Sequence, residues 1–164
     1  YVAGKIYLGL FYTTKDTNKE YLVSVMSFGS LRKNLGNISK DNHYELLRFS
    51  NSKFINVIGG ASKLLKYFEK HYNPEYIISY ADKRWSKGNL YQQLNFELIR
   101  ESVPNYFYVK GLSRENRFNY RKDILVSKYN CSPEMTERQF MQEVMNMNRI
   151  YDCGNYVFEK SYKK

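Results

Sequence analysis

The stretch IISYADKRWSKGNLYQQLNF, residues 77–96, contains most of the information about the fold of this chain. It begins with an apolar strand over Ile77–Tyr80, which stops at a carboxylate, Asp82. A basic loop with a tryptophan and a glycine follows, then a short helix over Asn89–Leu94 and a second strand that opens at Phe96. A buried strand that holds such a loop in place is one way to present cations and an aromatic ring to a polyanion.

Composition and charge narrow the class of protein. The chain has 164 residues, 43% of them hydrophobic, which suits one domain with a packed core. Its formal net charge is +10, and 17% of its residues are aromatic. Cations combined with aromatic rings favour a nucleic-acid partner, with a solubilising basic surface as the alternative. The sequence contains no apolar run long enough to span a bilayer and no signal-peptide pattern, so we expect a cytoplasmic protein without a membrane partner.

The residue types that most enzymes use are sparse or badly spaced. Cys131 and Cys153 lack the spacing of a metal site, and His43 and His71 are too few for zinc, so no metal is expected. The two cysteines could pair, but reduced thiols inside a cell are the simpler expectation. The sequence shows no Ser–His–Asp or Cys–His nucleophile, no Walker-type motif and no metal-nuclease motif. We therefore do not expect this chain to cut DNA by itself.

Hydrophobic periodicity predicts a mixed α/β domain. The first two strands are expected to form a hairpin, and an amphipathic helix is expected after Gly59 and before Pro74. Two later strands are expected to be joined by a turn at Pro104. We expect residues 1–111 to form the core and residues 112–164 to form a basic helical extension and closing strand packed on the same domain. The predicted strands cover residues 5–12, 21–28, 44–49, 77–80, 96–100, 106–109 and part of 149–158, and a later helix covers 136–148.

A glycine-containing turn precedes the predicted amphipathic helix. Glycines at a helix N-terminus let backbone N–H groups face an anion, and the helix dipole adds to the attraction. Asn56, Gly59, Gly60, Ala61 and Ser62 therefore form a candidate pyrophosphate site. The alternative is a tight turn that needs glycine for its dihedral angles.

The loop after the strand at residues 77–80 is the second candidate site. Arg84 and Lys87 could hold phosphate and Trp85 could stack on a base, while Tyr91 could donate a proton. In the alternative interpretation, Asp82 caps the following turn or pairs with Arg84, and Trp85 covers the core.

A basic segment with interleaved aromatic residues is the third candidate. In a helical register Arg114, Arg117 and Arg121 share one face, three and four residues apart, and Lys122 follows them. Phe118 lies off that face and could dock the helix on the core. This segment is expected to bind a nucleic-acid backbone, with a solvated surface helix as the alternative.

The order of the predicted elements resembles the GNAT (N-acetyltransferase-like) fold. In that fold a Gln/Arg-x-x-Gly-x-Gly/Ala loop holds the pyrophosphate of acetyl-CoA, and residues 56–61 (NVIGGA) are similar, with Asn56 in the first position. Residues 90–96 (LYQQLNF) resemble the family's LYxKxGF segment, with Gln93 in place of its lysine. The tyrosine of that segment, here Tyr91, often serves as a general acid.

More closely, the chain resembles the C-terminal domain of phage homing endonucleases of the Hef-like and VSR-like group. The resemblance implies a DNA-binding domain without catalysis of its own, in a phage-infected bacterial cell, with the nuclease domain N-terminal in the same polypeptide and outside this sequence. The matching segments run nearly from end to end. They are LVSVMSFG at 22–29, YELLRF at 44–49, GGAS at 59–62, SYADKRW at 79–85, PNY at 104–106, RF at 117–118, RKD at 121–123 and RIYDCGN at 149–155.

For this function we expect phosphate contacts from cationic residues and stacking from an aromatic one. We also expect the loop after residue 80 and the segment near residue 117 to form one continuous face shaped for a duplex. The expected DNA-binding residues are Arg32, Lys33, Arg84, Trp85, Lys87, Arg114, Arg117, Arg121 and Lys122.

The chain is also similar to the phage DNA-modification family called Mom, through its FG…SYAD pattern. This similarity implies an alternative function, an acyltransferase that modifies adenine in DNA with an acetyl-CoA-type donor. Asn56 and the residues 59–62 would then hold the cofactor pyrophosphate. Asp82 would orient or deprotonate the adenine amine, and Tyr91 would act as the general acid.

Overall fold

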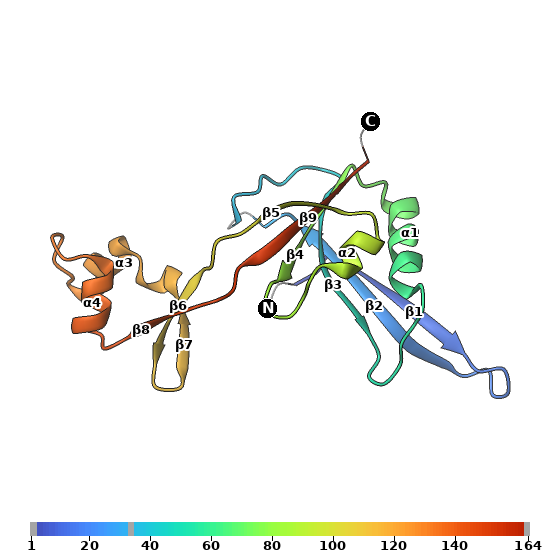
Figure 1. Ribbon diagram of the computed structural model, residues 1–164, viewed down its shortest axis with the longest axis horizontal. Helices are drawn as coiled ribbons and strands as arrows, with labels where there is room; N and C mark the ends of the chain where they lie inside the picture. The colour runs from blue at the N-terminus through green and yellow to red at the C-terminus, as the bar shows by residue number, and fades with distance from the viewer. Residues whose placement is uncertain (1–2, 33–34, 163–164) are drawn as a thin grey trace. The chain divides into compact units, whose positions relative to one another are not determined.

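The computed structural model describes residues 3–32 and 35–162, and the chain divides into two compact units. Unit 1 contains Tyr1–Glu101 and Tyr156–Lys164, and unit 2 contains Ser102–Asn155. Unit 2 is therefore an insertion between two strands of unit 1, as the colours of Figure 1 show.

Unit 1 is built on a six-stranded mixed sheet with the order β1-β2-β3-β4-β9-β5. The first three strands form an antiparallel meander, whereas β3 and β4 are parallel and need a crossover, which α1 (Gly60–Tyr72) supplies. The prediction of a mixed α/β fold is confirmed. The strands are β1 (Ile6–Thr13), β2 (Glu20–Ser30), β3 (His43–Asn51), β4 (Tyr76–Asp82), β5 (Glu97–Glu101) and β9 (Asn155–Ser161).

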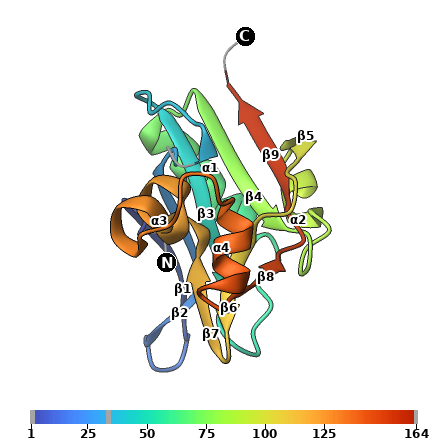
Figure 2. The same ribbon diagram turned by 90° about the vertical axis from the view of Figure 1, so that its left-hand side faces the viewer.

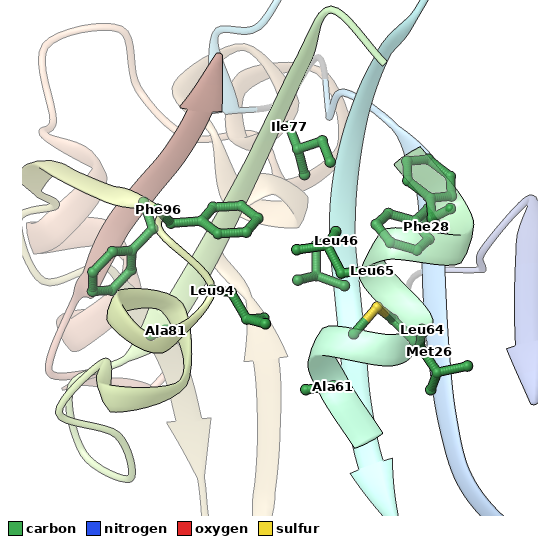
Figure 3. Close-up of a cluster of buried hydrophobic side chains, with 12 residues drawn as sticks. Met26, Phe28, Leu46, Ala61, Leu64, Leu65, Ile77, Ala81, Leu94 and Phe96 are labelled. Carbon is green, nitrogen blue, oxygen red and sulfur yellow. The ribbon is translucent and has the colours of Figure 1, made fainter. Parts of the chain in front are cut away.

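The helix α1 forms because its apolar side chains recur three and four residues apart. Leu64, Leu65 and Phe68 are buried on one face and pack on the sheet, and Figure 3 shows the leucines among the core side chains of β2, β3 and β4. Phe68 stacks on Phe28 of β2 with ring centroids 3.6 Å apart. The helix ends at Asn73, which adopts the left-handed conformation. This packing is the main core of unit 1.

The parallel pairing of β3 with β4 is short. It covers three residue pairs, from His43 with Tyr76 to Glu45 with Ile78. Beyond this point Ser79 donates a side-chain hydrogen bond of 2.7 Å to the Leu46 carbonyl. A side chain therefore continues the link between the two strands where the backbone ladder stops.

A loop connects β4 to the short helix α2 (Asn89–Gln93) and is anchored by a glycine. Gly88 has φ 82°, and a Cβ atom placed on it would lie 2.3 Å from the Phe158 ring of β9. Only glycine fits here, because the position needs both the left-handed conformation and a close approach to an aromatic ring. The end of β4 is thus tied to β9.

Unit 2 has its own antiparallel sheet and its own core. The sheet order is β7-β6-β8, and Figure 2 shows α3 and α4 beside these strands. Tyr108 of the central strand is fully buried with Leu125, Phe140 and Met141 from the helices. The elements are β6 (Tyr106–Lys110), β7 (Ser113–Asn116), the 3₁₀ helix η2 (Arg117–Tyr120), α3 (Lys122–Tyr129), α4 (Glu137–Glu143) and β8 (Asn148–Tyr151).

The structure differs here from what the sequence predicts. The strands over 96–100 and 106–109 do not form a hairpin, because β5 pairs with β9 while β6 pairs with β7 and β8. The boundary between the two parts lies after Glu101 rather than after residue 111. Unit 2 contains eight Lys and Arg against six Asp and Glu, a net charge of +2, so unit 1 carries the remaining +8.

Substituting Gly88→Ala tests the anchor of the loop. The new methyl group would clash with the Phe158 ring and force a strained φ, so we expect a loss of about 2–5 kcal/mol in the free energy of unfolding, measured by urea denaturation. Gly59→Ala is the matched control, because Gly59 also has a positive φ, 72°, but has nothing within 4 Å of a new Cβ. We expect the control to lose only about 1 kcal/mol. Equal losses would show that the contact with Phe158 contributes nothing.

Candidate nucleic-acid interface

The loop that follows β4 is held by a compact set of hydrogen bonds. The Asp82 carbonyl accepts the backbone N–H groups of Trp85 at 3.0 Å and Ser86 at 2.9 Å. The Asp82 carboxylate accepts the Arg84 backbone N–H at 2.8 Å, and the Ser86 hydroxyl accepts the Gly88 N–H at 3.1 Å. The loop Asp82–Gly88 is therefore a defined turn whose side chains have fixed starting points.

This loop displays an aromatic ring and two cations. Trp85 is 79% exposed, so the interpretation that it covers the core is wrong. The Arg84 guanidinium lies 5.0 Å from the indole centroid and 3.3 Å from the Asp82 carboxylate. Lys87 is exposed and has no carboxylate within ion-pair distance in the described part of the chain. We call Arg84, Trp85 and Lys87 the Trp85 surface.

Asp82 has a structural role in this loop. It caps the turn and pairs with Arg84, which is the alternative that the sequence left open. Both carboxylate oxygens therefore already accept hydrogen bonds within the chain. This leaves Asp82 less available to orient or deprotonate a substrate amine.

Arg32, another predicted DNA-binding residue of unit 1, forms its contacts within the chain. Arg32 forms a two-point ion pair with Glu45, with N–O distances of 2.6 and 3.0 Å, and lies 4.9 Å from the Tyr80 ring centroid. The Glu45 side chain is 1% exposed, so its charge depends on Arg32 for compensation. Arg32 is thus not a free phosphate contact, and Lys33 lies outside the described residues.

The arginines of unit 2 do not lie on one helix, so the predicted helical register is wrong. Arg114 lies in β7, Arg117 begins η2, and Arg121 precedes α3. The break has a local cause: the Asn116 side chain accepts the Phe118 N–H at 3.0 Å and starts a new turn.

The same arginines are nevertheless brought onto aromatic rings. The Arg114 guanidinium lies 4.5 Å from the Phe107 centroid. Arg117 and Arg121 lie 5.3 and 4.4 Å from the Phe118 centroid. Among the described residues, none of these three arginines has a carboxylate within ion-pair distance. We call Arg114, Arg117 and Arg121 together the arginine surface, although Arg114 and Arg117 contact rings on opposite faces of β6, Phe107 and Tyr106.

Lys122, which was expected to join this group, has a different role. Its amine donates to the Ser132 carbonyl at 2.5 Å and to the Met135 carbonyl. Lys122 therefore holds the loop between α3 and α4, and its amine already has acceptors within the chain.

A polar cluster that the sequence analysis missed supports the arginine surface. Glu137 of α4 accepts hydrogen bonds from the hydroxyls of Tyr106 at 2.8 Å and Tyr108 at 2.6 Å, and Arg149 of β8 lies 3.3 Å away. Burial and the bond to Glu137 raise the pKa of both tyrosines. The Arg117 guanidinium lies 5.1 Å from the Tyr106 ring centroid. The hydrogen bond to Glu137 therefore holds in place one of the rings that Arg117 contacts. In the sequence, the signal for this cluster is the spacing of Tyr106 and Tyr108, which places both side chains on the same face of a strand.

Tyr91 is built into the core at the end of the β3–β4 pairing. Its hydroxyl lies 2.9 Å from the Ser79 hydroxyl, and its ring stacks on Phe158 with centroids 4.7 Å apart. Burial raises the pKa of Tyr91, the hydrogen bond with Ser79 opposes this effect, and the charge of Glu45 adds to it. The hydroxyl is therefore protonated at neutral pH and already bonded.

In the candidate pyrophosphate turn, backbone conformation and close packing explain the presence of the glycines. Gly59 is the N-cap of α1 and adopts the left-handed conformation, without a capping side-chain hydrogen bond among the described residues. A Cβ atom on Gly60 would lie 3.1 Å from Val57 and 3.2 Å from the Ser24 hydroxyl. Asn56 is exposed, Gly60 and Ala61 are buried, and Ser62 is half-buried. This packing accounts for Gly60 without a ligand.

Comparisons with known proteins identify no family, so the evidence for function is the geometry of the structure. A scan against family models finds no match, and a search of curated proteins finds no match either. Among residues 3–32 and 35–162, no cluster of His, Cys, Asp or Glu could hold a metal ion. No helix in the same residues is long and apolar enough to cross a membrane.

Substituting Arg32→Ala tests the buried ion pair. Removing one partner leaves the buried Glu45 carboxylate uncompensated, so we expect a loss of about 3–5 kcal/mol in the free energy of unfolding. Arg84→Ala removes an exposed pair with Asp82 and should cost about 0–1 kcal/mol. Chemical denaturation of both variants measures the difference, and a loss near zero for Arg32→Ala would contradict it.

Proposed function

We propose that this chain is a DNA-binding module that contacts the phosphate backbone through the arginine surface. The observation that carries the proposal is the placement of Arg114, Arg117 and Arg121 on aromatic rings without carboxylate partners among the described residues. The Trp85 surface of unit 1 adds exposed cations and an exposed ring. A net charge of +10 on 164 residues draws a polyanion toward both units.

Stacking on a ring prepares an arginine to bind phosphate. A guanidinium that lies on an aromatic face is held in one orientation, and its N–H groups at the edge remain free to donate. Phosphate oxygens accept such pairs of hydrogen bonds, and contacts of this kind position a protein on DNA. Because no carboxylate lies within ion-pair distance of these donors in the described chain, they remain available to a phosphate.

We further propose that the chain is the GNAT-like C-terminal domain of a phage homing endonuclease, without catalysis of its own. The mixed sheet, the parallel β3–β4 pair and the α1 crossover support a GNAT-like scaffold. Internal hydrogen bonds of Asp82 and Tyr91 support a module that binds without reacting. The nuclease domain of the same polypeptide would then be its partner.

A second candidate function is a Mom-like acyltransferase that modifies adenine with an acetyl-CoA-type donor. The observation in its favour is the short β3–β4 ladder, which stops after three residue pairs, although the Leu46 carbonyl beyond it is already bonded to Ser79. Asn56 and the residues 59–62 would hold the pyrophosphate at the start of α1. Tyr91 would be the general acid and Asp82 would position the amine.

Arg117→Ala and Arg121→Ala test the DNA-binding function. We expect each variant to weaken duplex binding and to reduce the slope of log affinity against log salt by about 1, because each removes about one phosphate contact. Arg138→Ala is the matched control, since Arg138 is an exposed arginine of α4 in the same unit that stacks on none of these rings. Fluorescence anisotropy with a labelled duplex gives both quantities.

The salt dependence of the unmodified protein is the companion measurement. If six to ten phosphates are engaged, affinity should fall by roughly 10³- to 10⁵-fold between about 50 and 200 mM salt. A flat dependence, or an Arg138→Ala effect as large as the other two, would contradict the assignment of the arginine surface.

Isothermal titration with acetyl-CoA separates the two candidate functions. The binding module should give no heat, because Asp82, Tyr91 and Gly60 already have structural partners. Micromolar binding of acetyl-CoA would favour the acyltransferase instead.

A further inference from the structure

We propose that Trp85 stacks on an unpaired base, so that the loop Asp82–Gly88 selects DNA with exposed bases over an intact duplex. This inference rests on the proposed DNA-binding function and adds the form of DNA that the protein prefers. It assigns to unit 1 a role that differs from the phosphate contacts of the arginine surface.

The exposure of the indole is the first argument. Trp85 is 79% exposed although tryptophan is among the side chains that gain most from burial. The loop that carries it is fixed by the hydrogen bonds of Asp82 and by the contact of Gly88 with Phe158. The ring is thus held outward by a defined turn, which lowers the entropic cost of binding a partner.

The charges beside the ring point to the class of partner. Arg84 lies 5.0 Å from the indole centroid and also forms an exposed pair with Asp82, whereas Lys87, two residues after Trp85, has no carboxylate partner in the described chain. A ring between two cations matches a strand of DNA, in which flat bases alternate with phosphates. An apolar protein surface would gain nothing from these charges and would have to desolvate them.

The accessibility of a base face determines whether Trp85 can stack on paired or on unpaired DNA. A base inside a duplex has both faces covered by its neighbours, so stacking on Trp85 would first require unstacking at a cost of a few kcal/mol. An unpaired base offers its face without that cost. We therefore expect single-stranded or locally opened DNA to bind more tightly than duplex of the same length.

Trp85 is the only tryptophan of the chain, so its fluorescence reports on this contact directly. The experiment uses three ligands of equal length: oligothymidine, an abasic strand with the same phosphates, and a duplex. Oligothymidine should quench the fluorescence. The abasic strand and the duplex should bind through their phosphates with little quenching.

Two variants complete the test through anisotropy of labelled DNA. Trp85→Ala should weaken binding of oligothymidine by roughly 5- to 150-fold, the range measured for one base–aromatic stack, and should leave the abasic strand unaffected. Phe54→Ala is the matched control, because Phe54 is 93% exposed beside Lys53 on another loop of unit 1. It should bind all three ligands as the unmodified protein does.

The outcomes separate this inference from the function on which it rests. Binding of oligothymidine without quenching, or equal quenching by the duplex, would overturn the stacking role while leaving DNA binding intact. An equal loss of affinity for oligothymidine and for the abasic strand in Trp85→Ala would do the same. If none of the three ligands binds, the proposed function itself fails.

Discussion

The position of β4 in the sheet is the constraint on which the rest of unit 1 depends. β4 lies between β3 and β9, and its side chains are buried on both faces. Ile77 packs in the cluster that includes α1, while Ile78 packs with Leu31 and Val157 on the other face. A strand buried on both faces cannot slip by one residue without moving these groups, so the loop that begins at Asp82 has a fixed origin.

The polar residues around β4 form internal contacts that stabilise its position in the sheet. Glu45 is neutralised by Arg32, Ser79 bonds the Leu46 carbonyl, and Tyr91 bonds Ser79. Each buried side-chain nitrogen or oxygen atom that the structure describes has a hydrogen-bond partner. The exposed side chains that can meet another molecule include cations and aromatic rings in both units.

Local elements of the fold were predictable, and pairings between distant segments were not. The spacing of Leu64, Leu65 and Phe68 is a local signal, and α1 lies where it predicts a helix. The pairing of β5 with β9 joins segments separated by the whole of unit 2, and no local pattern encodes such a partner. The loss of the helical register near Arg117 has local causes instead, since the hairpin with β6 keeps residues 113–116 extended and the Asn116 side chain starts a new turn.

The sequence by itself determined the kinds of side chain available: cations interleaved with rings, a single tryptophan in a glycine-ended loop, and too few His and Cys for a common metal site. Tertiary structure alone decided which of them face outward. Arg32 compensates the charge of the buried Glu45, and Lys122 donates to the carbonyls of Ser132 and Met135, so neither cation is free. Exposure and pairing depend on what the rest of the chain brings nearby, which spacing along the chain does not specify.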